Sequence, residues 1–160
     1  MTALGLIDEA VAFRATMSRL PSGVSIITTR VADAPVGMTA SSVTPLSLDP
    51  LQLLVCVGNH LFTRSAISEH GRFGVNVLGE EHQDLARQFA SRGDRFAGVS
   101  YDEEQGVPVL HDAIASIVCD VAEELPGGDH TIFIGTVVSY EHIDRVRPLI
   151  HCGGEFGRIA

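Results

Sequence analysis

The sequence predicts a mainly β protein, built as a closed or split β-barrel of antiparallel strands with a few added helices. Most of its apolar runs are short and rich in β-branched residues, as strands are. Helical periodicity occurs only in inserted segments and does not alternate with the strands, which argues against a doubly wound α/β sheet. Turn residues separate successive strands, a pattern typical of antiparallel barrels.

The first half of the chain predicts one helix and three strands. The helix is expected over residues 6–20, where apolar side chains recur at spacings of three and four until Pro21 stops the run. The strands are expected to follow, the second of them after an Asp-Ala-Pro turn, at residues 23–29, 36–44 and 51–57. The third strand is largely apolar, so we expect it at the centre of the sheet.

The second half predicts two short helices and further strands. Helices are expected over 60–69, with Asn59 as a candidate cap, and over 80–90. The polar, glycine-punctuated segment 91–106 predicts a surface loop. The strands are expected at residues 72–78, 114–123 and 130–143, followed by a closing hairpin of 149–152 and 155–159.

Length and composition predict one folded domain, spanning residues 1–160. Hydrophobic residues make up 45% of the chain and charged residues 19%, as in soluble globular proteins. No apolar run approaches the roughly 20 residues that a membrane-spanning helix needs. The first residues lack the basic region and apolar core of a secretory signal, so none is expected.

Charge and cysteine usage exclude several kinds of function. The formal net charge is −9, with no lysine and eleven scattered arginines, which argues against binding nucleic acid. The cysteines, Cys56, Cys119 and Cys152, are widely spaced, so neither a zinc site nor a disulfide framework is indicated. Cys56 and Cys119 lie in apolar strand-like runs, which predicts buried thiols. We expect a protein of the reducing cytoplasm.

The segment Gly37–Pro50, GMTASSVTPLSLDP, carries the strongest functional signal. Five hydroxyl side chains fall within residues 39–47, beside small residues and between two apolar strands. Small residues allow close approach of a ligand to the backbone, and hydroxyls with free N–H groups can hold a phosphate without a cation. This chemistry suits the ribityl phosphate of a flavin. The alternative is an ordinary strand followed by a Ser/Thr/Pro turn.

The order of residues in this segment resembles the G-x-T-A-S-S-x-x-x-x-S-L-x-P signature of the short-chain flavin reductases, the reductase components of two-component flavin-dependent monooxygenases. Further similar runs extend the resemblance over residues 13–159: VCVGNHLFT at 55–63, FGVNVL at 73–78, DLARQFA at 84–90, DRF at 94–96, GDHTIFIG at 128–135 and PLIHCGGEFGR at 148–158. The resemblance implies an FMN-binding, flavin reductase-like split barrel of antiparallel Greek-key type. It also implies a homodimer with the site near the subunit interface.

The resemblance implies a role for particular residues. His130 is expected to be catalytic, bordering the nicotinamide pocket over the flavin. The residues expected to bind the cofactors are Thr39, Ala40, Ser41, Ser42, Ser47, Leu48, Gly58, Asn59, Thr63, Phe89 and Phe156. Arg92 or Arg95 could also reach a phosphate. Asn59 departs from a common family pattern with lysine at this position, which weakens the case for a charge interaction with flavin there.

The implied reaction is hydride transfer from C4 of NADH or NADPH to N5 of FMN or FAD, with reduced flavin passing to a separate monooxygenase. The cofactors supply the difficult chemistry, so no general acid or base is expected to be indispensable. No metal is expected, because the other histidines lack a repeated ligand spacing. The glycines at 153–157 lie too near the C-terminus to open a Rossmann unit, and there is no Walker A or G-x-S-x-G motif.

Two alternatives remain open at this stage. One is another split-barrel oxidase, acting on pyridoxine phosphate or using a deazaflavin. The other is a non-catalytic flavin- or haem-binding redox sensor. The sequence does not distinguish FMN from FAD, NADH from NADPH, or a permanently bound flavin from one that is a substrate.

Overall fold

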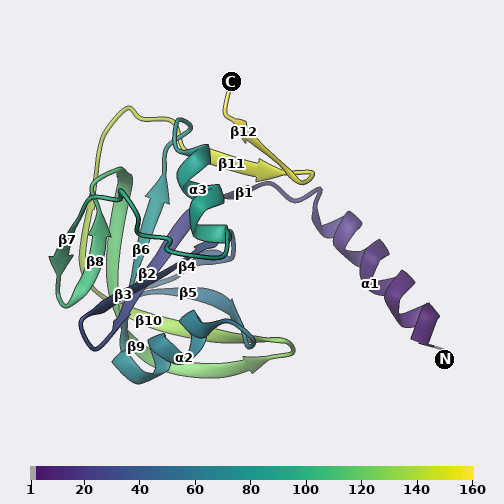
Figure 1. Ribbon diagram of the computed structural model, residues 1–160, viewed down its shortest axis with the longest axis horizontal. Coiled ribbons are helices and arrows are strands. Elements are labelled where there is room, and N and C mark those ends of the chain that lie inside the picture. Colours follow the sequence, from purple (N-terminus) through teal and green to yellow (C-terminus); the bar gives the residue numbers. More distant parts are fainter. Residues whose placement is uncertain (1–2) are drawn as a thin grey trace.

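The computed structural model describes residues 3–160, with side-chain surroundings from residue 8 onward (Figure 1). Its centre is a seven-stranded antiparallel sheet in the order β3-β2-β6-β9-β10-β5-β4. These strands are β2 (Ser25–Val31), β3 (Ala34–Ala40), β4 (Val43–Leu48), β5 (Leu51–Gly58), β6 (Arg72–Leu78), β9 (Ala113–Gly127) and β10 (His130–His142). The mainly β, antiparallel architecture that the sequence predicts is confirmed.

The remaining elements surround this sheet. Two small antiparallel sheets pair β1 (Ser22–Gly23), β11 (Leu149–Cys152) and β12 (Glu155–Arg158), and β7 (Tyr101–Glu104) with β8 (Val107–Leu110). The helices are α1 (Ala3–Met17), α2 (Phe62–His70) and α3 (Gln83–Ala90). In Figure 1, α3 lies beside the upper end of the sheet and α2 at its lower end. No helix of the described chain is long and apolar enough to cross a membrane.

Two edges of the large sheet meet through a short link. β3 and β4 are its edge strands, and only Ser41 and Ser42 separate them in the chain. β3 pairs with β2 up to Ala40, and β4 pairs with β5 from Val43 onward. The single strand expected over 36–44 is therefore wrong, because the chain changes partner strand within it. This link places two hydroxyls where the sheet turns back on itself.

The β7–β8 hairpin also departs from the prediction, which treats residues 91–106 as a loop. Its first strand, YDEE, has no alternation of apolar and polar residues, so the sequence gives no strand signal. The turn is made by Gln105 and Gly106, both with positive φ. The other predicted strands and helices are confirmed with shifts of a few residues at their ends, and β1 and β4 are additional strands that the sequence does not predict.

The core has two main layers, on opposite faces of the sheet. Ile26 and Ile27 are both fully buried and adjacent on β2, so their side chains point to opposite sides. Ile27 packs with a cluster that includes Val55, Phe73 and Phe133. Ile26 packs with a second cluster drawn from β6, α3, β8, β11 and the residue between β1 and β2: Val24, Leu78, Ala86, Phe89, Leu110 and Leu149. These clusters hold α3 and the C-terminal hairpin against the barrel.

The cysteines divide by burial. Cys119 is fully buried, as predicted, and burial, aided by the charge of Asp120, raises the pKa of its thiol to about 12. Cys56 is only half-buried, because its side chain points to the opposite side of β5 from the buried Val55 and Val57. Burial still raises its pKa. Cys152 is exposed on β11, and all three thiols are free.

Candidate functional site

The end of β5 lies between the hydroxyl-rich link and the turn that carries His130. Ser42 pairs with Cys56 on one side: its Oγ donates to the Cys56 carbonyl at 2.9 Å, and its own carbonyl accepts from the Cys56 N–H at 3.2 Å. On the other side, β10 pairs His130 with Gly58. Neighbouring strands are about 4.8 Å apart, so two strand spacings separate these features by roughly 10 Å.

His130 begins β10 and is exposed to solvent. Its Nδ1 lies 2.7 Å from Oδ1 of Asp129. A carboxylate only accepts, so Nδ1 carries the proton, and this hydrogen bond does not use Nε2. The hydrogen bond, together with the attraction of the imidazole, lowers the pKa of Asp129. The carboxylate therefore stays ionised at neutral pH, and its hold on the ring is lost only as the pH falls through that lowered pKa.

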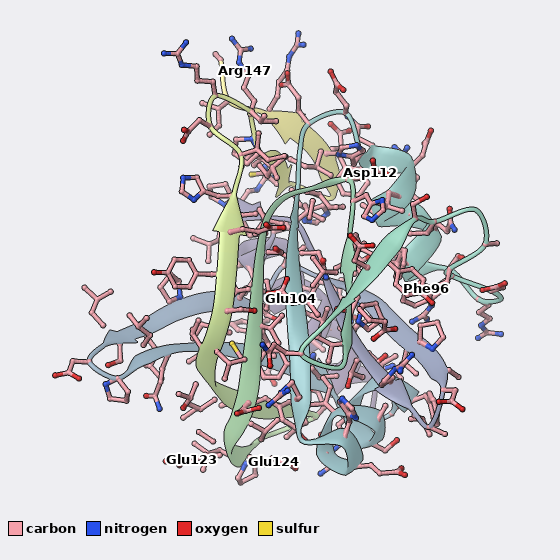
Figure 2. All side chains as sticks on the ribbon, turned by 90° about the vertical axis from the view of Figure 1, so that its left-hand side faces the viewer. Phe96, Glu104, Asp112, Glu123, Glu124 and Arg147 are labelled. Atoms are coloured by element: carbon pink, nitrogen blue, oxygen red, sulfur yellow. The ribbon has the colours of Figure 1, made fainter. Side chains whose placement is uncertain are left out.

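A polar hollow of about 420 Å³ adjoins this turn. Asn59, Arg64, Glu124, His130 and Thr131 line it, with the apolar Leu125 and Pro126. Figure 2 shows Glu124 at the lower end of the molecule, where β9 approaches its turn into β10. The volume falls within the range of small-molecule sites, and the polar groups come from three different elements.

A second hollow, of about 350 Å³, is lined in part by the β5–α2 connection and the start of α2. Its walls include Gly37, Leu61, Thr63, Arg95 and Phe96 (Phe96 is labelled in Figure 2). Arg95 donates from Nη1 to the Gly37 carbonyl at 2.8 Å, so its guanidinium is held in place at this wall. The segment 59–64 contributes to both hollows: Asn59 and Arg64 line the first, and Leu61, Phe62 and Thr63 line the second.

The hydroxyls of the link have unequal surroundings. Ser41 and Ser42 are exposed, whereas Ala40 is buried. Thr39 donates to the Ala86 carbonyl at 2.6 Å, which ties β3 to α3. Ser41 and Ser42 are therefore the two hydroxyls of this group that face solvent next to the end of β5.

Ser47 and Leu48 lie in a different place from the rest of the predicted site. Both line an apolar hollow of about 580 Å³, together with Val77, Ile117 and Tyr140. Ser47 accepts a hydrogen bond from the Asp49 N–H, and Leu48 is 90% exposed. The sequence run is continuous, but the β4 strand carries its far end away from Gly58 and His130.

Two aromatic residues also fall outside the hollows near His130. Phe89 is fully buried, and a Cβ on Gly37 would lie 2.6 Å from its ring, so it fills the core beneath that wall. Phe96 packs edge-on against it at 4.9 Å. Phe156 is half-buried under the guanidinium of Arg87, 5.2 Å from its ring centroid. Neither Phe89 nor Phe156 lines the hollows described above, whereas Phe96 lines the second.

Asn59 is not a helix cap, contrary to the prediction. The residue before α2 is Leu61, without a side-chain cap. The Asn59 side chain instead donates to the Gly128 carbonyl at 3.2 Å and accepts from the Thr131 hydroxyl at 2.7 Å. Sequence reasoning misses Thr131, Arg64 and Glu124, because their meeting depends on strand pairing between distant segments.

Thr63, by contrast, sits on the border of the second hollow with only 2% of its surface exposed. Gly58 is buried at the end of β5, and a Cβ there would lie 3.0 Å from the His60 ring.

Among the described residues, no group of His, Cys, Asp or Glu could hold a metal ion. The site therefore offers hydroxyls and backbone amides, with His130 and Arg64 at the first hollow and Arg95 at the second.

Comparison with known proteins gives a consistent result. Residues 17–160 match the family described as "Flavin reductase like domain". The chain is 38% identical over 146 residues to the reductase component of 4-nitrophenol 4-monooxygenase/4-nitrocatechol 2-monooxygenase from Rhodococcus opacus, covering 91% of this chain and 78% of that protein. It is 32% identical over 154 residues to FMN reductase (NADH) SmoA of Agrobacterium fabrum, covering 96% and 88%.

A comparison with solved structures also finds a flavin reductase. The NADH:FAD oxidoreductase SgcE6 of Streptomyces globisporus C-1027, in complex with NAD and FAD fragments, superimposes with a TM-score of 0.91 at 32% identity. The match covers 96% of this chain and 94% of that one. Fold and sequence therefore agree over almost the whole chain.

Proposed function

The chain belongs to the flavin reductase-like domain family, and on this premise we propose that it is an NADH-dependent flavin reductase. It transfers a hydride from the nicotinamide to FAD or FMN and supplies the reduced flavin to a separate flavin-dependent monooxygenase. Relatives named as NADH-dependent FMN and FAD reductases and as a monooxygenase reductase component support this proposal.

The observation that carries the proposal is the position of the β5 end. It has exposed hydroxyls at Ser41 and Ser42 on one side and an oriented histidine on the other. The spacing of about two strands suits a flat tricyclic ring lying across the strand end. The residues present fit a flavin, since backbone N–H groups and hydroxyls can hold its ribityl phosphate, with the Ser42 hydroxyl turning from the Cys56 carbonyl to donate.

In this proposal the chain's own residues bind and orient. Ser41, Ser42 and Thr63 hold the flavin, and Arg95 adds a guanidinium at the border of the second hollow. The bound flavin supplies the hydride-accepting chemistry. His130 presents Nε2 to the nicotinamide in the first hollow and helps to fix its angle of approach.

Weak anchoring of the flavin is part of the proposed function. The exposed hydroxyls of Ser41 and Ser42 beside the β5 end carry no charge, and Arg95 already donates to the Gly37 carbonyl. A flavin held mainly by neutral groups can leave, as it must if a separate oxygenase uses it. The three free thiols support a reducing, cytoplasmic setting.

The direct assay mixes the protein with NADH and excess FAD, then FMN, and follows nicotinamide oxidation. We expect catalytic turnover with at least one flavin. Flavin binding without NADH oxidation would favour a redox sensor instead, and no oxidation with either flavin would count against the proposal.

Replacing His130 with alanine should lower kcat/KM for NADH by about tenfold and leave KM for the flavin unchanged. The reason is that the ring orients the nicotinamide but carries no indispensable proton, and lost orientation of this kind costs about 1.4 kcal/mol. Steady-state kinetics with each substrate varied in turn measures both values. A complete loss of hydride transfer in a folded variant would show that the role is chemical.

We further propose that the protein is a homodimer. Helix α1 projects from the rest of the molecule (Figure 1), and its described side chains, from Asp8 to Met17, are all exposed. Val11 and Phe13 are 61% and 67% exposed and lie two residues apart, on different faces of the helix. An isolated helix of this length is marginal in water, so contact with a second copy would supply the missing cover.

The homodimer is tested by light scattering of the full chain. We expect twice the mass of 17.1 kDa for the natural chain, and a shift toward the monomer for Phe13→Asp. Glu9→Gln, on the same exposed helix, is the matched control and should leave the mass unchanged. A monomer at every concentration would contradict the proposal.

A further inference from the structure

We propose that Asn59 is a positioning residue for His130, acting through a hydrogen-bonded network with Thr131 and Arg64. This inference rests on the proposed function, because His130 matters only if the nicotinamide occupies the adjoining hollow. It concerns the three side chains that hold the turn from β9 into β10.

Asn59 contacts this turn at three points. Its backbone N–H donates to the Asp129 carbonyl at 2.9 Å. Its side-chain Nδ2 donates to the Gly128 carbonyl at 3.2 Å, and its Oδ1 accepts from the Thr131 hydroxyl at 2.7 Å. The residues bonded to Asn59 therefore flank His130 on both sides. One side chain at the end of β5 fixes the path of the backbone that carries the histidine.

Thr131 links Asn59 to helix α2. It is only 6% exposed, and its hydroxyl accepts from Nε of Arg64 at 3.2 Å while donating to Asn59. A hydroxyl has one proton, so the bond from Arg64 leaves the Thr131 proton directed at the amide oxygen. The buried Thr131 hydroxyl therefore has a partner both as donor and as acceptor.

Arg64 is itself held on α2. Its guanidinium lies 4.0 Å from Glu124, and Glu124 accepts a hydrogen bond from Ser68 at 2.9 Å. The network thus joins the β5–α2 connection, α2, β9 and β10 at one corner of the molecule. Buried hydrogen-bonded groups whose partners are satisfied, as the Thr131 hydroxyl is, add rigidity to such a network.

His130 needs such support because its own side chain is weakly anchored. Within the part of the chain that the structure describes, Asp129 is the recorded hydrogen-bond partner of its ring. The Asp129 side chain is itself 93% exposed and adjacent in sequence, so it moves with the same turn. The direction of Nε2 is therefore set by the turn, and the turn is set by Asn59 and Thr131.

The chemistry of position 59 is specific. An amide both donates to Gly128 and accepts from Thr131. A lysine would donate but could not accept, and it would place a second cation near Arg64. An aspartate would accept but would face the Gly128 carbonyl with a negative charge. Of these side chains only the amide satisfies both partners.

The test is a double-mutant cycle between positions 59 and 130. Asn59→Ala, which removes both side-chain hydrogen bonds to the turn, should lower kcat/KM for NADH about fivefold and leave KM for the flavin unchanged. In the His130→Ala background, the same substitution should have no further effect. Thr131→Val, which removes the hydroxyl, should lower kcat/KM for NADH to the same extent. Thr131→Ser, which keeps the hydroxyl, should retain the kcat/KM of the natural chain. Ser65→Ala, which removes a local hydrogen bond on α2, is the control and should change nothing.

A spectroscopic readout separates this inference from the proposed function. In the NMR spectrum of the full chain without ligands, the His130 ring-proton signal should shift or broaden in Asn59→Ala and Thr131→Val. It should not change in Ser65→Ala. This result is expected even if the natural chain fails to oxidise NADH. Three results would each overturn the inference. They are additive losses of kcat/KM for NADH in the Asn59→Ala/His130→Ala double mutant, a raised KM for the flavin in Asn59→Ala, and an unchanged His130 signal in Asn59→Ala or Thr131→Val.

Discussion

Replacing Asn76 with leucine is expected to lower the free energy of unfolding by about 3 kcal/mol, because it breaks a fully buried polar network. Asn76 lies on β6 with none of its surface exposed. Its Nδ2 donates to the Ile26 carbonyl and to Oγ1 of Thr28, both at 3.1 Å. Its Oδ1 accepts from the Leu110 N–H at 2.8 Å.

The size of this effect follows from what the substitution leaves behind. The Leu110 N–H would lose its acceptor in the core, and an unsatisfied buried group costs about 1–3 kcal/mol. Thr28 would lose a donor, although its own bond to the Pro108 carbonyl at 2.6 Å would remain. The network joins β2 and β6 to β8, so the β7–β8 hairpin would lose an attachment as well.

Urea unfolding of the natural chain and the Asn76→Leu variant measures the difference. Gln52→Leu is the matched control: it also replaces an amide with leucine on the large sheet, but its bond to Thr136 is long, at 3.4 Å, and only part-buried. We expect the control to change stability by under about 1 kcal/mol. If both variants lost the same free energy of unfolding, the buried network of Asn76 would contribute nothing specific to stability.

Replacing Ser42 with aspartate is expected to raise KM for the flavin by about thirtyfold with little change in KM for NADH. A carboxylate next to the Cys56 carbonyl would face the anionic tail of the flavin. Two like charges about 4 Å apart repel by roughly 4 kcal/mol at the effective dielectric of a protein surface, and screening reduces this to about 2 kcal/mol.

Ser47→Asp is the matched control for this substitution. Ser47 belongs to the same hydroxyl-rich run, but it lines the apolar hollow on the far part of β4. The same charge there should leave KM for the flavin within about twofold, since exposed charges beyond a Debye length of roughly 8 Å are largely screened. If Ser47→Asp raised KM for the flavin as much as Ser42→Asp does, the flavin-binding surface would have to extend along β4.

The local patterns of the sequence predict most of the fold. β-branched runs locate the long strands, and three- and four-residue periodicity locates the helices, because both signals depend on neighbouring residues. The β7–β8 hairpin is missed because its first strand is polar. The break between β3 and β4 is missed because it arises from a change of partner strand, which no local pattern records.

The site is predicted less completely for the same reason. The hydroxyl run and the Gly-Asp-His turn are continuous segments, so their composition is visible in sequence. Their approach across β5 depends on strand order. The network of Asn59, Thr131 and Arg64 is built from residues up to 72 positions apart, and the same pairing turns a residue expected to cap a helix into one that holds a turn.

Separation of free from bound flavin after reduction tests the central claim most directly. That claim is that neutral groups beside the end of β5 hold a flavin long enough to be reduced and then release it. The protein would be mixed anaerobically with NADH and a large excess of flavin, then ultrafiltered. We predict reduced flavin in the filtrate in many-fold excess over protein. Reduction limited to one flavin per chain, with that flavin retained above the membrane, would contradict the account.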